Sequence, residues 1–235
     1  MTVKNRILPT FLLLATVTGL HAQTYVEKNA TYPLAADGNK YVVSGVVTFG
    51  DKSDETIFAN AMLWNIDNVC PQLREGVSDV NVTAHSFNIA MTMIVGGNTY
   101  YCNGSFKAQS GKFVYSLTDI RVESTVVAFK RIMAFEKLNP EKFTNHKAMM
   151  EEFVSVESGA LNQLFDYINT NEPEEITHWS DIGYCRPVEG MNQTECKLAF
   201  GKPKSTSETE SEVQWSYSSS FYLFFKDGVV ATIIK

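Results

Sequence analysis

The spacing of apolar residues first predicts a strand and then a helix. β-branched and aromatic residues fill 40–49, which is typical of a strand. Apolar residues then recur at helical spacing from Ile57 to Ile66, and Pro71 would end the helix. Ser53 is a suitable N-cap in front of the acidic residues that open this helix. We therefore expect a strand followed by a capped helix.

From residue 78 onward the pattern changes to that of strands. Strand-like runs occupy 80–95, 99–108 and 112–124, and 126–135 is a candidate for one more. Turn signals that contain glycine separate the first three runs. This order predicts a meander of three to five antiparallel strands with one helix lying across it, so the expected fold class is α+β.

Residues 139–175 hold the clearest helical pattern of the chain. Pro140 is a typical first helical residue, and an apolar stripe continues from Phe143 to Ile168. The stretch 169–175 is polar and contains a proline, so we expect the helix to end there. A domain boundary should follow it.

The C-terminal part should form a second, smaller unit. Asn192 and Glu195 have the spacing of a capping box, and Gly201 is a natural residue after a helix end, so a short helix is expected between them. Three strand-like runs follow, with a tight turn at 226–228, which predicts a small helix and a three-stranded antiparallel meander. The domain assignment is 23–138 for the α+β sheet domain, 139–175 for the long helix and linker, and 176–235 for the C-terminal domain.

The first residues are typical of a leader that is removed from the chain. Residues 1–22 combine Lys4 and Arg6 with an apolar run that ends near Ala22. The alternative is a transmembrane anchor, but the run is short and is interrupted by proline, glycine and threonine. We interpret 1–22 as a signal peptide, so the mature chain should be exported and should have no transmembrane segment.

Composition and charge restrict the class of partner. The 235 residues contain 20 Lys and Arg against 26 Asp and Glu, a net charge of −6 with neutral histidines. A chain this acidic is not suited to bind nucleic acid or anionic lipid non-specifically. Its 44% hydrophobic content is sufficient for a packed core.

The even number of cysteines predicts disulfides in an exported chain. The four are Cys70, Cys102, Cys185 and Cys196, and sequence alone permits three pairings. Nearness in sequence favours Cys185 with Cys196, which leaves Cys70 with Cys102. No C-x-x-C is present, so the sequence supports neither a zinc ribbon nor a thioredoxin-like pair.

Motifs for catalysis or metal binding are weak. Gly201 and Lys202 are followed by a proline, and this excludes a phosphate-binding loop of the Gly-Lys-Ser/Thr type. A thiol nucleophile would need a nearby histidine, and His85, His146 and His178 have no motif spacing to a cysteine. The acidic runs 172–175 and 208–212 are typical of solvated loops, so we expect no metal site and no cofactor.

Aromatic residues crowd the C-terminal strands and are the strongest functional signal. We select Trp215, Tyr217, Tyr222 and Phe224 as candidate partner-binding residues. Period-two alternation places part of this aromatic set in the core, whereas the rest could form a partner-binding face, because Trp and Tyr often anchor interfaces. The alternative is that all of them pack in the core or across strands.

Five separated elements of the C-terminal part follow a pattern in a fixed order. They are Gly190-Met191, a short helix, Gly201-Lys202-Pro203, Trp215 with Tyr217, and the run from Phe225 to Val229. This pattern resembles the BamE-like (SmpA/OmlA) family of outer-membrane-assembly proteins of Gram-negative bacteria. The resemblance implies helices on a small antiparallel sheet, similar to half of a β-lactamase-inhibitor protein. The chain lacks the lipid-bearing cysteine of that family, and Cys196 stands where the family usually has an aliphatic residue.

Motifs in the N-terminal part carry a second resemblance. They are "FGDKSDETIFANAMLWN" (49–65), "GKFVYSLTDIRVES" (111–124) and "KLNPEK" (137–142). These motifs resemble a domain of unknown function found in exported proteins of gut-type Gram-negative bacteria. The resemblance implies a TATA-binding-protein-like strand-helix-sheet fold and supplies no activity.

These observations together predict a non-catalytic exported protein. We expect a protein-binding or scaffolding module in the periplasm or at the outer-membrane periphery of a Gram-negative cell, with an envelope protein as its partner. The prediction allows secretion and peripheral membrane association. The alternatives are a secreted enzyme inhibitor, which the inhibitor-like fold would permit, and a Cys/His hydrolase.

Overall fold

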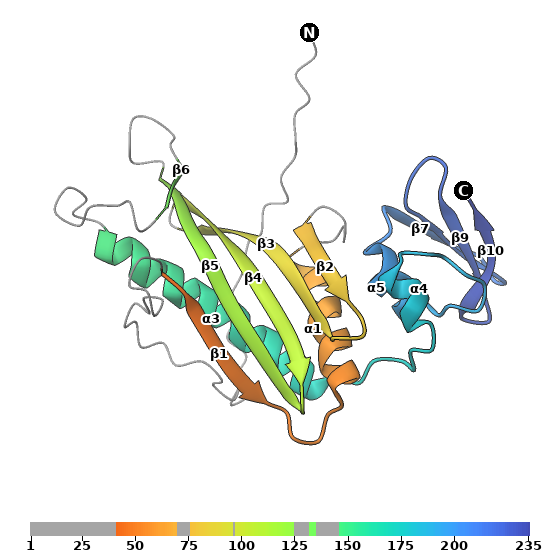
Figure 1. The fold of residues 1–235 in the computed structure, drawn as a ribbon. Coiled ribbons are helices and arrows are strands. Elements are labelled where there is room, and N and C mark those ends of the chain that lie inside the picture. Colours follow the sequence, from red (N-terminus) through yellow and green to blue (C-terminus); the bar gives the residue numbers. More distant parts are fainter. Residues whose placement is uncertain (1–40, 70–75, 96, 125–131, 135–145) are drawn as a thin grey trace, which may run out of the picture.

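The computed structural model describes residues 41–69, 76–95, 97–124, 132–134 and 146–235. Two antiparallel sheets organise them, with helices packed between and behind these sheets (Figure 1). The larger sheet has the strand order β1 (Val43–Thr48), β5 (Lys112–Ser124), β4 (Asn98–Gln109), β3 (Ser86–Val95) and β2 (Val77–Asn81), and β6 (Ile132–Ala134) pairs with β5. The smaller sheet has the order β10 (Val229–Ile234), β9 (Tyr222–Lys226), β8 (Val213–Ser216) and β7 (Ser205–Glu208). The fold class is therefore α+β, as predicted.

Two helices cover one face of the larger sheet, where the sequence predicted one. They are α1 (Asp54–Asn68) and α3 (His146–Thr170), and they pack against each other behind the strands (Figure 1). Aromatic rings join helix to sheet: the Phe165 ring lies 5.9 Å from that of Phe113, and the Phe153 ring lies 5.8 Å from that of Tyr100. Burial of such rings supplies most of the driving force for this layer.

Helix α1 is buried almost all round, since it lies between the large sheet, α3 and the C-terminal helices. It begins as predicted, because the Ser53 side chain accepts a hydrogen bond from the backbone N–H of Thr56. Its two buried amides, Asn60 and Asn65, donate to backbone oxygens, Asn60 to Asn171 and Asn65 to Ala61. A helix enclosed in this way needs apolar residues on every side.

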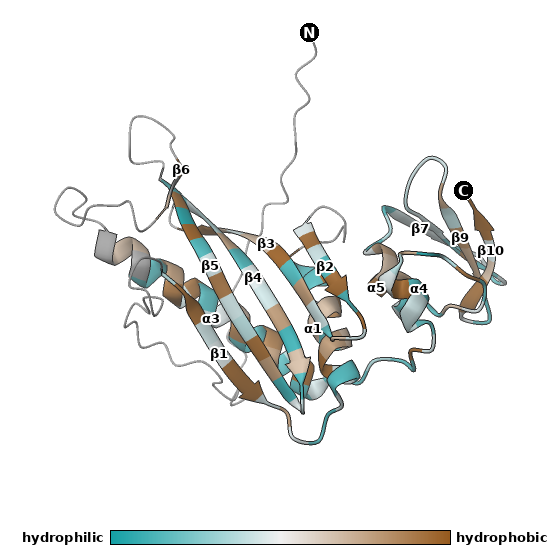
Figure 2. Ribbon diagram, in the orientation of Figure 1, coloured by the Kyte–Doolittle hydropathy of each residue, from teal (hydrophilic) through white to brown (hydrophobic). Residues whose placement is uncertain are grey.

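The other face of the large sheet is not covered by any described element. Hydropathy alternates along its strands, since side chains on a strand point to opposite faces (Figure 2). Close packing on the inner face requires a glycine in β1: a Cβ on Gly45 would lie 2.5 Å from the hydroxyl oxygen of Tyr115. On the outer face Val46 and Val114 form an exposed cross-strand pair.

The C-terminal part places α4 (Trp179–Gly183) and α5 (Gln193–Phe200) between the small sheet and α1 (Figure 1). The predicted capping box is confirmed: the Asn192 side chain accepts from Glu195 N–H, and the Glu195 side chain accepts from Asn192 N–H. Gly201 ends α5 with a φ of 79°.

An ion pair and a ring contact join the C-terminal part to α1. Lys197 of α5 lies 2.7 Å from Asp67 at the end of α1, and the Trp179 ring lies 5.8 Å from that of Phe58. Buried residues of both parts belong to one continuous cluster. The division into domains at residue 175 stays a prediction. No helix in the described ranges is long and apolar enough to cross a membrane.

Two details of the strands differ from the expected elements. The run 80–95 is not one strand, because a turn at 82–85 separates β2 from β3 and places His85 at a φ of 48°. The small sheet has a fourth strand, β7, whose residues are all exposed and polar. The predicted start of the long helix at 139–145 and the predicted signal peptide lie outside the described residues.

Candidate functional site

The four selected aromatic residues divide between the two faces of the small sheet. Trp215 is buried, and it pairs across the sheet with the buried Leu223. Tyr222 and Phe224 lie on the opposite face and are partly exposed. The period-two alternation therefore separates the set as predicted, and α4 and α5 determine which face is the inner one.

Trp215 and Tyr217 take part in packing inside the C-terminal unit. The Trp215 ring lies 4.8 Å from that of Phe225, and the Tyr217 ring stacks on Phe221 at 5.1 Å. The Tyr217 hydroxyl donates to the Gly201 carbonyl oxygen at 3.3 Å, and burial raises the pKa of Tyr217. Trp215 is therefore an interior residue, and Tyr217 is half-buried and held by packing against Phe221 and Phe200. The partner-binding hypothesis narrows to Tyr222 and Phe224.

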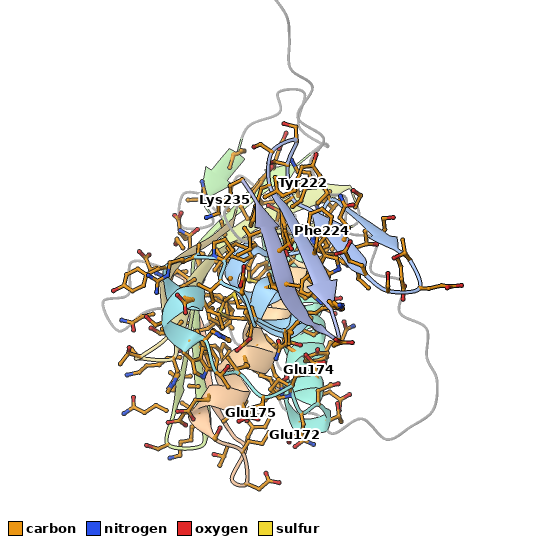
Figure 3. The ribbon with its side chains drawn as sticks, turned by 90° about the vertical axis from the view of Figure 1, so that its right-hand side faces the viewer. Glu172, Glu174, Glu175, Tyr222, Phe224 and Lys235 are labelled. Carbon is orange, nitrogen blue, oxygen red and sulfur yellow. The ribbon has the colours of Figure 1, made fainter. Side chains whose placement is uncertain are left out.

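Tyr222 and Phe224 lie on β9, an inner strand of the small sheet, and each forms a row with residues of the neighbouring strands. Tyr222 is paired with Ser216 on one side and with Ile234 on the other. Phe224 is paired in the same way with Gln214 and Thr232. Figure 3 shows the two aromatic side chains on the side of the molecule that faces away from the large sheet. We call Tyr222, Phe224 and Ile234 the aromatic face.

The sequence analysis did not select Ile234. It is 47% exposed at the end of β10 and completes the row of Tyr222. The alternation that would have identified it is broken, because the register of β10 shifts between Val230 and Thr232. A one-residue bulge of this kind inverts the side-chain pattern beyond it.

Charge is distributed unevenly around the aromatic face. None of the residues in its paired rows on β7 to β10 is acidic, and Lys235 lies beside it with its Nζ atom 5.9 Å from the centre of the Phe221 ring. The acidic linker of Glu172, Glu174 and Glu175 lies on the same side of the molecule (Figure 3). Asn192 connects the two regions, since its amide donates to the Glu175 carbonyl at 2.8 Å and its backbone bridges to Val229.

The predicted disulfide between Cys185 and Cys196 is wrong for this structure. Both residues have free thiols, because Cys196 lies on the buried side of α5 whereas Cys185 lies at the surface turn after α4. Cys102 is also free and buried on β4, so the pair with Cys70 is not formed either, and Cys70 itself lies outside the described residues.

The buried thiols are poor candidates for nucleophiles. Burial raises the pKa of Cys102 to about 12, and burial also raises the pKa of Cys196. Because the thiolate is the reactive form, thiols in such surroundings are inert near neutral pH. Cys185 is the most accessible of the three described cysteines.

His178 and Glu195 form a partly buried contact at the start of the C-terminal part. The Glu195 carboxylate accepts from the backbone N–H groups of Thr177 and His178 and lies 2.9 Å from the His178 Nδ1 atom. Burial alone would raise the pKa of Glu195, but the backbone hydrogen bonds of Asn192, His178 and Thr177 and the contact with His178 together hold it below its usual value. These contacts are those of an anchoring carboxylate at a helix start.

The other histidines do not complete a catalytic arrangement. His85 lies in the β2–β3 turn, 3.6 Å from Glu55, and His146 begins α3. Within the part of the chain that the structure describes, no cluster of His, Cys, Asp and Glu has the arrangement of a metal site.

Comparison with known proteins identifies the fold. No family model matches the sequence, and no curated protein matches it. A TBP-like protein from Parabacteroides distasonis has a similar solved structure, with a TM-score of 0.51 and 11% identity over 60% of this chain and 99% of that chain. A DUF4468 family protein from Bacteroides ovatus matches with a TM-score of 0.44 and 12% identity over 61% of this chain and 94% of that one. The likeness to the TBP-like protein shows a TBP-like α+β fold for about 60% of the chain and assigns no activity to it.

Proposed function

We propose that this chain is a non-catalytic protein-binding module that is exported to the periplasm or the outer-membrane periphery of a Gram-negative cell. The observation that carries the proposal is the aromatic face, on which Tyr222, Phe224 and Ile234 lie in adjacent rows of the small sheet and are not covered by a described element. An envelope protein would bind there.

The chemistry of the aromatic face fits a protein partner. Tyr and Phe offer a large apolar surface at low conformational cost, and truncating such an anchor in an interface commonly costs about 2 kcal/mol or more. Small polar residues surround them, namely Ser216, Gln214 and Thr232. An apolar centre with a polar rim is the usual anatomy of a protein interface.

Charge supports a protein rather than a nucleic acid as the partner. The chain has a net charge of −6, and the exposed Glu174 and Glu175 lie on the same side as the aromatic face. Phosphate groups would be repelled from this side. The C-terminal resemblance to outer-membrane-assembly proteins favours an envelope partner, and that resemblance rests on the sequence motifs alone.

Site-specific photo-crosslinking in intact cells tests the proposal. A photoreactive phenylalanine analogue at position 222 should capture an envelope protein, identified by mass spectrometry of the envelope fraction. The matched control carries the same analogue at position 114, since Val114 is also an exposed strand residue but lies on the large sheet. Phe224→Ser should weaken capture from position 222, whereas Val46→Ser should leave it unchanged.

Two outcomes would contradict the scaffold proposal. One is that neither position captures an envelope protein above background, and the other is that position 114 captures the same protein as efficiently as position 222. Capture of a hydrolytic enzyme from the culture medium, with loss of its activity in the complex, would instead support the alternative of a secreted inhibitor.

A further inference from the structure

A pocket of about 560 Å³ lies between the first turn of α1, the β2–β3 turn and α4. This volume falls within the roughly 300–1,000 Å³ that small-ligand sites usually have. The pocket is distinct from the aromatic face: Tyr222, Phe224 and Ile234 are not among the residues that line it. It therefore represents a second candidate site.

The walls of the pocket are held in place by local contacts. The Asn81 side chain accepts hydrogen bonds from the backbone N–H groups of Thr83 at 3.1 Å and Ala84 at 2.9 Å, which fixes the β2–β3 turn. Helix α4 approaches this turn through Gly183, where a Cβ would lie 3.1 Å from a methyl group of Val82. The pocket is thus formed by backbone that is already ordered, so a ligand would not have to order it.

Two aromatic side chains line the pocket: Trp179 at the start of α4 and Tyr184 directly after its end. Trp179 packs on Phe58 with its ring centre 5.8 Å away, and this contact fixes the indole at the pocket wall. Tyr184 is 79% exposed, which is unusual for so large a ring. Trp and Tyr rings at the edge of a pocket are suited to stack on a flat or cationic group.

One carboxylate defines the charge of the pocket. Glu55 lines it with a side chain that is 53% exposed, and its nearest ion-pair partner is His85 Nε2 at 3.6 Å. Among the described residues that line the pocket there is no lysine or arginine, so with a neutral His85 the one full charge that these residues carry is that of Glu55. The hydroxyl groups of Thr83 and Ser180 add neutral acceptors.

We infer that this pocket binds the guanidinium group of an arginine side chain from a partner polypeptide. A guanidinium is planar and permanently charged, so it stacks on Trp or Tyr while it donates two parallel hydrogen bonds to a carboxylate. The pocket offers both features, in Trp179 with Tyr184 and in Glu55. A partner would insert one arginine between α4 and α1. This inference does not rest on the aromatic face.

Titration of the full exported chain with a short peptide tests the inference. The probe is acetyl-Gly-Arg-Gly-amide, and the readout is the NMR signal of the Trp179 indole N–H group, assigned with Trp179→Phe. The other two tryptophans, Trp64 and Trp215, are buried and serve as internal references. The Trp179 signal should shift and saturate, whereas the references should not move.

The variants separate a specific site from non-specific attraction. Glu55→Gln should weaken binding by about tenfold, because it removes the charge that the guanidinium pairs with. The matched control is Glu210→Gln, an exposed acidic residue between β7 and β8, which should leave binding unchanged. Tyr184→Ser should also weaken binding. Thermal unfolding of each variant checks that the fold is retained.

Three results would overturn the inference. Equal binding of acetyl-Gly-Gln-Gly-amide would show that charge is not recognised. Undiminished binding in Glu55→Gln would remove the proposed partner of the guanidinium. A shift produced by maltose but not by the arginine peptide would reassign the pocket to a neutral sugar.

Discussion

Replacing Glu157 by glutamine should stabilise the protein at alkaline pH and leave it almost unchanged at acidic pH. Glu157 lies on α3 and is only 1% exposed, and its Oε1 atom has no hydrogen-bond partner among the described residues. Burial raises the pKa of this carboxyl from 4.5 to about 8. At neutral pH the folded protein therefore holds a proton that the unfolded chain has released.

The sign of the effect follows from proton binding. Between pH 4.5 and about 8 the folded state binds more protons at Glu157 than the unfolded state, so stability falls as the pH rises through this window. At 1.36 kcal/mol for each pH unit, the full window corresponds to roughly 4–5 kcal/mol. Relaxation of the structure around the charge reduces this, so we expect a loss of roughly 2–4 kcal/mol by about pH 8.

Urea unfolding at a series of pH values measures this loss. Glutamine has the shape of a protonated glutamate and never ionises, so Glu157→Gln should match the natural protein within about 1 kcal/mol near pH 5 and exceed it by roughly 2–4 kcal/mol near pH 8. Asp166→Asn is the matched control, because Asp166 is an exposed acid on the same helix. If the stability difference of Glu157→Gln stays constant across this range, the carboxyl is not held neutral and the reasoning fails.

Three further predictions concern a cap, a glycine and the thiols. Glu195→Gln should lower the free energy of unfolding by about 1–2 kcal/mol at neutral pH. Because the pKa of Glu195 in the folded protein lies below its usual value, the difference between variant and natural protein should disappear as the pH falls and the carboxylate is protonated. Thermal unfolding at a series of pH values measures this difference. Gly45→Ala should lower the free energy of unfolding in urea by about 1–3 kcal/mol, because the added Cβ would collide with the ring of Tyr115. An unchanged urea midpoint would show that the ring can move aside. Alkylation of the native protein followed by peptide mass spectrometry should label Cys185 and spare Cys196, and the reverse order would contradict the buried position of α5.

Local signals predicted the starts of α1 and α5, because the residues that decide them are neighbours in sequence. Ser53 caps α1, and Asn192 with Glu195 forms the capping box of α5, both as expected. Strands were harder to place. β7 consists of Ser and Thr with one Glu, so it has no apolar signal and exists because it pairs with β8. The turn at 82–85 has no glycine or proline, so the sequence pattern of 80–95, which is rich in valine and other apolar residues, predicts one continuous strand.

The sequence predicted which aromatic residues share a face of the small sheet, but not which of the two faces is exposed. Alternation separated Trp215 from Tyr222 and Phe224, yet both faces of the small sheet are aromatic, so the sequence could not decide which one is covered. The position of α4 and α5 decides it, and this position depends on contacts with α1 such as the ion pair between Lys197 and Asp67. Such long-range contacts leave no local pattern in the sequence.

The same junction explains why the pocket between α1, the β2–β3 turn and α4 has no sequence signature. Its lining comes from three separate segments, namely the start of α1, the β2–β3 turn and α4. Glu55 and Trp179 line the same pocket because α4 packs beside α1, with the Trp179 ring against that of Phe58. A ligand that contacts both residues binds the docked arrangement alone, so by linkage it must stabilise that arrangement. The aromatic face lies wholly within the small sheet, on the side opposite the buried Trp215. Binding at the pocket should therefore raise the stability of this packed arrangement and leave the aromatic face unaltered.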